Sequence, residues 1–227
     1  MSVVAYFIHA RRHCGSYTRE AQLAAELTSL AAHNHMSFCF CCGPCLGDGD
    51  GPSPDPSAST AALLSTKRKS GKVKISAMQA SSSGSGQIFC EQSVLQDRAY
   101  WEVTVESTGK SGIAVGVASA DHEPGAALGG GGDAPTSWSI ASRELPTPLQ
   151  AGDVIGVALD QGDYPVSLRF YQNGLPVTEQ RGPVTESTPV IELSDGAKVV
   201  CNFGAGSWMH KPVSGFEGII KSRSLLG

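Results

Sequence analysis

The sequence has few charged residues, few aromatic residues and no long apolar run. Of its 227 residues 17% are charged and 7% aromatic, and the formal net charge is −4. The one basic cluster, residues 67–69 with Lys72 and Lys74 close behind, is interpreted as a solvated turn, so we expect no nucleic-acid partner. No run approaches the roughly 20 apolar residues of a membrane-spanning helix. No Asn-x-Ser/Thr site occurs, so nothing indicates a glycosylated secreted protein.

The cysteines do not form the pattern of a disulfide-stabilised fold. There are seven, an odd number, and four of them fall within residues 39–45. This spacing favours a reducing compartment, and we expect a cytoplasmic protein. Cys90 and Cys201 lie in strand-like segments, where we predict small buried core residues.

Glycine is abundant, with 27 residues, as is typical of short strands joined by turns. In residues 100–106 the side chains of Trp101, Val103 and Val105 alternate with polar ones, which predicts a half-buried strand with Trp101 in the core. Asn173-Gly174 interrupts residues 166–177, and this dipeptide favours a type I′ hairpin turn. The predicted strands are 72–76, 87–90, 100–106, 112–119, 152–160, 166–177, 189–193 and 199–204.

Several of these segments together resemble the motifs of the SPRY domain family. Tyr-Trp-Glu-Val-Thr-Val (100–105), Gly-Ile-Ala-Val-Gly-Val-Ala (112–118), the Gly-Asp start of 152–160 with Asn173-Gly174, and Asn-Phe-Gly (202–204) follow the family's order. The resemblance implies an all-β fold, a bent antiparallel β-sandwich of the concanavalin A-like jelly-roll type. It also implies protein recognition without catalysis or cofactor. Residues 36–42, 107–109 and 210–216 resemble a small stand-alone type within the family.

The chain divides into four parts. Residues 1–35 form an extension, either with a short helix around residues 19–32 or disordered, or lie upstream of a working start at Met36. Residues 36–60 combine a cysteine-rich segment with a Gly/Pro/Ser linker. Residues 61–221 form the SPRY domain, in which Trp138 is also expected in the core, and residues 222–227 form a tail.

Motifs that suggest catalysis fail on their context. Thr-Gly-Lys-Ser (108–111) ends like a phosphate-binding loop, but a strand pattern follows where such a loop needs a helix. Glu102 and Glu106 share one face of a strand, yet their spacing of about 13 Å exceeds that of a glycosidase carboxylate pair. We therefore expect both glutamates to be solvated and the protein not to be an enzyme.

The cysteine cluster Cys39, Cys41, Cys42 and Cys45 leaves several alternatives open. Four cysteines this close leave little room for a tetrahedral zinc site, so we assign no metal. Cys42-Gly-Pro-Cys45 resembles a redox site but lacks the helix that such a site needs. S-acylation fits better, since two acyl chains give stable membrane attachment. Metal, redox and incidental roles remain open.

We expect the partner, a protein or short peptide, to bind the end loops of a monomeric sandwich, at residues 120–135, 161–165 and 204–211. These loops offer the apolar anchors Tyr164, Trp208 and Met209 and the polar groups His122 and Asp163. Trp208 and Met209 also fit a simpler role as covers of the sandwich edge. Two alternative functions stay open, a carbohydrate-binding sandwich and a cysteine-based metal or redox protein.

Overall fold

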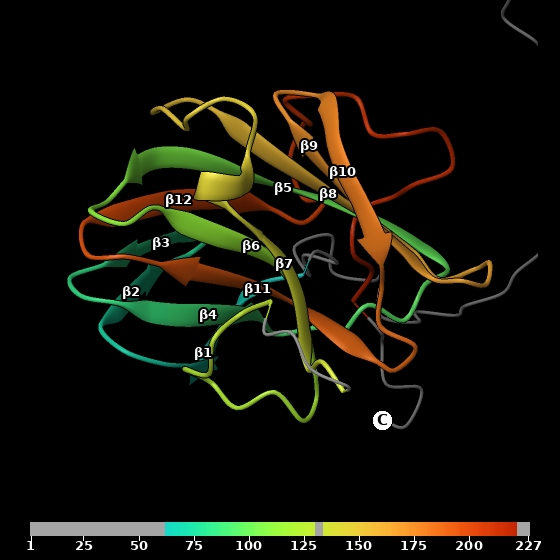
Figure 1. The fold of residues 1–227 in the computed structure, drawn as a ribbon, viewed down its shortest axis with the longest axis horizontal. Helices are drawn as coiled ribbons and strands as arrows, with labels where there is room; N and C mark the ends of the chain where they lie inside the picture. Colours follow the sequence, from blue (N-terminus) through green and yellow to red (C-terminus); the bar gives the residue numbers. More distant parts are fainter. Residues whose placement is uncertain (1–61, 130–133, 222–227) are drawn as a thin grey trace, which may run out of the picture. The chain divides into compact units, whose positions relative to one another are not determined.

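The computed structural model describes residues 62–129 and 134–221, which fold into a β-sandwich of two antiparallel sheets (Figure 1). The only helical element in these residues is a 3₁₀ turn, η1 (Ser142–Glu144). The expected all-β fold class is confirmed. The helix expected around residues 19–32 lies outside the described residues. No helix in the described part of the chain is long and apolar enough to cross a membrane.

The two sheets differ in size. The smaller has five strands in the order β1 (Leu64–Lys69), β4 (Gly86–Cys90), β11 (Ser187–Leu193), β6 (Ile113–Ser119) and β7 (Ser137–Ala141). The larger has seven strands in the order β10 (Leu175–Arg181), β9 (Ser167–Gln172), β8 (Val154–Asp160), β5 (Arg98–Thr108), β12 (Ala197–Asn202), β3 (Gln79–Ser82) and β2 (Val73–Ser76).

The core lies between the sheets and follows the two-residue period of the strands. On β5, Trp101, Val103 and Val105 are fully buried, so Trp101 is a core residue as predicted. Trp138 on β7 is half-buried and packs against this core. Cys90 and Cys201 are free, buried thiols, also as predicted, and burial raises the pKa of the Cys90 thiol to about 12.

The predicted hairpin joins β9 to β10. Asn173 and Gly174 have φ angles of 52° and 78°, the left-handed region that a type I′ turn requires at both central positions. Asn173 Nδ2 donates to Asp153 Oδ1 at 3.0 Å, and Asn173 Oδ1 accepts from Val154 N at 2.8 Å. These two bonds fasten the hairpin to the start of β8, so Asp153 builds the scaffold.

The interpretation of residues 67–69 as a solvated turn is wrong, because they belong to β1. Leu64 and Ser65 are buried on this strand, which pairs with β4, and Arg68 is half-buried. Strands β3 and β7 were also not predicted from the sequence. Both are short and Ser-rich, so their alternation of apolar and polar residues is weak.

Candidate functional site

One end of the sandwich is organised around the segment between β4 and β5, residues 91–97, which we call the hub. Hydrogen bonds join it to three other segments: Val94 N to Ser187 O (2.8 Å), Gln161 N to Asp97 O (2.8 Å), Gln96 Nε2 to Gly218 O (2.8 Å) and Ile220 N to Gln96 Oε1 (2.9 Å). Gln161 Nε2 also donates to Gln96 O at 2.8 Å. The loops at this end are therefore held on a fixed frame.

Exposed apolar side chains concentrate in these segments. Eight large hydrophobic side chains are exposed in the described residues, and five of them come from the hub or from segments next to it. The five are Leu63, Leu95, Tyr164, Val184 and Ile220, which we call the hub patch. Exposed apolar side chains gathered on segments that hydrogen bonds hold together are typical of an interaction site.

The hub end also holds two of the predicted contact residues, Asp163 and Tyr164. Arg98 Nε pairs with Asp160 Oδ2 at 3.0 Å, and Arg98 Nη2 pairs with Asp163 Oδ2 at 3.1 Å. Tyr164 is 84% exposed, the largest exposed fraction among the large apolar residues that the structure describes. The ion pairs hold the β8–β9 loop while its tyrosine stays free for contact.

Residues 204–217, which we call the strap, form a second exposed element. The strap begins just after β12, and its end returns beside its start. There Ile219 N donates to Phe203 O at 2.7 Å. A Cβ at Gly204 would lie 2.7 Å from Gly218 Cα, so the two ends approach this closely only as glycines. A compact loop with touching ends is an Ω-loop, a class that is frequently functional.

The strap lies against the outer face of the seven-stranded sheet, and Glu102 on β5 fixes it there. Glu102 Oε2 accepts from Met209 N at 2.9 Å, and Oε1 accepts from His210 N at 2.8 Å and from Tyr100 Oη at 3.2 Å. The residue is only 1% exposed. The expectation that Glu102 is solvated is therefore wrong, because the strap covers the strand face on which it lies.

Trp208 and Met209, the other two predicted anchors, both lie on the strap but differ in exposure. Trp208 is half-buried and packs edge-on against Tyr100, with ring centroids 5.1 Å apart. Tyr100, Ala158 and Phe216 form the small apolar cluster that it joins. Met209 is 67% exposed. Trp208 thus fastens the strap to the sheet, whereas the Met209 side chain is free for contact.

His122 was predicted as an exposed polar contact residue, but it is buried. It therefore cannot contact a partner directly in this structure. Its Nδ1 lies 2.9 Å from Thr136 Oγ1, and its ring lies near Phe89 on the outer face of the five-stranded sheet. The Arg68 guanidinium lies 4.3 Å from the centroid of that same phenyl ring. Burial, and next the Arg68 charge, lower the pKa of His122, which favours the neutral imidazole.

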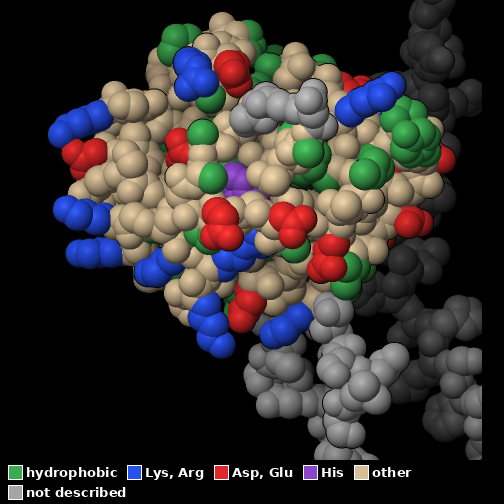
Figure 2. Space-filling model, turned by 60° about the horizontal axis from the view of Figure 1, so that its bottom comes forward, with side chains coloured by type: hydrophobic (Ala, Val, Ile, Leu, Met, Phe, Trp, Pro, Cys, Tyr) green, Lys and Arg blue, Asp and Glu red, His purple; other side chains and the backbone are tan. Residues whose placement is uncertain are grey.

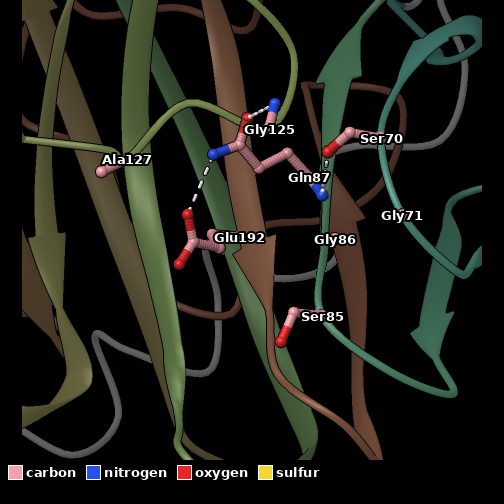
Figure 3. A pocket seen from close by; sticks show the side chains of 8 residues that line it. All are labelled: Ser70, Gly71, Ser85, Gly86, Gln87, Gly125, Ala127 and Glu192. Carbon is pink, nitrogen blue, oxygen red and sulfur yellow. Dashed lines mark hydrogen bonds between the residues drawn. The ribbon is translucent and has the colours of Figure 1, made fainter.

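A hollow of about 450 Å³ opens beside this face, between the turns that precede β2 and β4 and the loop after β6 (Figure 3). The Gln87 side chain accepts from Gly125 N at 2.8 Å and donates to Glu192 Oε2 at 2.9 Å. Figure 3 shows these two bonds spanning the hollow from β4 to the loop and to β11. The main polar groups of the hollow therefore bind one another, which suits a structural brace better than a ligand site.

The charge on the visible surface is mixed. In Figure 2, Lys and Arg side chains gather along one edge, acidic side chains lie among and beside them, and hydrophobic side chains gather toward the opposite edge. In the described ranges no three His, Cys, Asp or Glu residues come together as metal ligands would. The cysteines Cys39, Cys41, Cys42 and Cys45 lie outside those ranges.

Sequence patterns missed Glu102, Gln87 and Arg68 as the side chains that organise the outer faces. The period of each strand places a side chain on one face or the other. Which distant loop covers that face is not encoded in the strand. A polar side chain inside a largely apolar strand, as at Gln87 and Glu102, is the one signal that was present, and Arg68 lacks it because β1 is mostly polar.

Comparison with known proteins agrees with this architecture. Residues 98–206 match the sequence model of the SPRY domain. The solved TRIM65 PSpry domain superposes with a TM-score of 0.51 at 20% identity, over 63% of this chain and 92% of that one. A human SPRY domain gives a TM-score of 0.48 at 18% identity, over 62% and 98%. The SPRY domain of human HERC1 gives 0.48 at 17% identity, over 61% and 96%. None of the curated proteins matches the sequence.

Proposed function

We propose that this chain, which contains a SPRY domain, is a non-enzymatic protein-interaction module that binds a partner protein or short peptide through the hub patch. SPRY domains are generally non-catalytic interaction modules. The observation that carries the assignment is the concentration of exposed apolar side chains at the hub end, five of the eight in the described residues.

The physical argument rests on the rigidity of the frame. A side chain that is already held near its bound position loses little conformational entropy on binding. Arg98, Gln96 and Gln161 fix the backbone from which Leu95 and Tyr164 project. Tyrosine buries a large area at small entropic cost and keeps a hydroxyl for hydrogen bonding. Asp163 supplies a charged group at the rim of the same surface.

Affinity capture from cell extracts, with quantitative identification of the bound proteins, tests this function. The test variant is Leu95→Ser/Tyr164→Ser, and the control is Leu175→Ser, which removes a comparably exposed apolar side chain on β10, outside both the hub patch and the strap. We expect the hub variant to lose at least tenfold of a specific partner and the control to keep it. Equal recovery of every partner by wild type and hub variant contradicts the assignment.

We further propose that the module works as a monomer in the cytoplasm, tethered to a membrane by acyl chains on Cys39, Cys41, Cys42 and Cys45. Support comes from the number and closeness of these cysteines, because two chains suffice for stable attachment. Acyl-exchange labelling of wild type and of a variant with all four replaced by serine measures the modification directly. Membrane fractionation of the same pair measures whether the protein is membrane-bound. A wild type that is neither labelled nor found in the membrane fraction contradicts the proposed attachment.

A further inference from the structure

A cavity of about 420 Å³ lies beside the strap on the outer face of the seven-stranded sheet. Its lining is mainly apolar and comes from the turn before β3, from β5 and β12, and from the strap. The lining residues that matter here are Met78, Glu102, Thr104, Val200, Asn202 and Met209. Two flexible methionine side chains thus flank a cavity that has a carboxylate in its wall.

The Glu102 carboxylate is buried without a cation. Its hydrogen-bond donors are two backbone N–H groups and a phenol hydroxyl, all of them neutral. No lysine, arginine or histidine in the described ranges lies within ion-pair distance of it. Oε2 accepts a single bond, from Met209 N, which leaves it acceptor capacity. A buried carboxylate is costly unless it is paired, so this site favours an incoming positive charge.

Glu106, four residues along the same strand, shows the opposite condition. Its Oε2 pairs with Lys198 Nζ at 2.8 Å, and both of its oxygens accept from Gln79 Nε2. The exposed carboxylate of this strand face is therefore neutralised within the fold, whereas the buried carboxylate is not. Glu106 is thus the natural control for Glu102.

We propose that this cavity binds the side chain of a lysine or arginine supplied by a partner. Basic side chains carry an apolar stem and a charged head. The stem lies between Met78 and Met209, and the head donates to Glu102 Oε2. Charge-assisted hydrogen bonds of this kind are about twice as strong as neutral ones. The site is separate from the hub patch and does not depend on the partner that binds there.

NMR titration of protein labelled at the methionine methyl groups tests the site, because the chain has only four methionines and two of them line the cavity. The probes are the Nα-acetyl N-methylamides of lysine, arginine and norleucine, the last being the uncharged analogue of lysine. We expect the Met78 and Met209 signals to shift with lysine or arginine, and norleucine to bind at least tenfold more weakly. Equal binding of norleucine, or no shift with any probe, overturns the proposal.

Two sets of variants assign the effect to the carboxylate. Glu102→Gln is expected to weaken the lysine probe at least tenfold, and Glu106→Gln is expected to leave it within twofold. If Glu102→Gln does not fold, Thr104→Lys tests the same site. Residue 104 lies on the same strand face and is only half-buried, so a lysine there would place its own ammonium group in the cavity. Thr104→Lys should abolish probe binding and Thr104→Val should retain it, and wild-type binding by Thr104→Lys contradicts the site. The titration uses free probes, so its failure leaves the hub assignment untouched.

Discussion

Each sheet of the sandwich has an outer face partly covered by a long loop, and the two covers are held by opposite chemistry. On the five-stranded sheet, Arg68 Nη2 donates to His122 O in the loop after β6 at 3.4 Å, and Gln87 accepts from Gly125 N of the same loop at 2.8 Å. On the seven-stranded sheet, the Glu102 carboxylate accepts from two strap amides. The Arg68 guanidinium and the Gln87 amide hold the loop after β6, whereas the Glu102 carboxylate holds the strap.

The difference lies in where each charge can be stabilised. Arg68 is half-buried, so its guanidinium reaches water on one side and the face of Phe89 on the other. Glu102 is almost fully buried and depends on neutral donors alone. The Arg68 charge on the first face is therefore stabilised by water and by the phenyl ring. The Glu102 charge on the second face has no cation beside it and would be stabilised by one. A brace and a binding site can thus arise from the same arrangement of sheet and loop.

The largest effect is expected from Glu102→Ala. The substitution leaves two backbone N–H groups and one hydroxyl under the strap without their acceptor, which costs about 3 kcal/mol of unfolding free energy after partial replacement by water. Urea denaturation measures this loss. Glu106→Ala, which removes a more exposed carboxylate, should cost less than about 1 kcal/mol. Equal losses for the two variants would show that Glu102 does not hold the strap.

Arg68→Ala should have the next largest effect, a loss of about 1–2 kcal/mol of unfolding free energy, because it removes the ring contact and the bonds to the carbonyls of Ser119, at the end of β6, and His122, in the loop. Arg68→Lys keeps the charge but not the planar stacking, and should recover less than half of that loss. The neighbouring exposed Lys67→Ala serves as the control. A full recovery by lysine would show that charge alone, and not stacking, holds this cover.

His122 should make the five-stranded face sensitive to acid. Its pKa is lowered in the folded state by burial, so below about pH 6.5 the unfolded chain takes up a proton that the folded chain does not. Stability is therefore lost as the pH falls from the unfolded pKa toward the folded one, by at most about 1.4 kcal/mol per pH unit. His122→Gln should flatten this dependence in denaturation experiments between neutral and mildly acid pH. An unchanged slope would assign the acid sensitivity to other groups.

The smallest effect on stability is expected at the hub patch. Leu95→Ser and Tyr164→Ser each remove an exposed side chain, so the unfolding free energy should change by no more than about 0.5 kcal/mol. Thermal denaturation of each single variant checks this. A large destabilisation would mean that the patch is part of the fold rather than a free contact surface.

Local sequence patterns predicted much of the fold, and the reason is visible on particular strands. The alternation around Trp101 and the Asn173-Gly174 dipeptide depend only on near neighbours, and both are confirmed. Glu102 and His122 depend on loops that are distant in sequence or irregular, and both were placed at the surface wrongly. Residues 67–69 failed for a related reason, since an arginine that stacks on a phenyl ring inside a strand looks in sequence like any solvated charge.

The most direct test of the proposed function is amide hydrogen exchange of the chain with and without the partner captured on it. Binding through the hub patch predicts added protection in residues 94–98, 160–165 and 182–187, with none at Gly125 and Ala126 on the braced face. Protection that falls on residues 120–129 and spares the hub end would contradict the account.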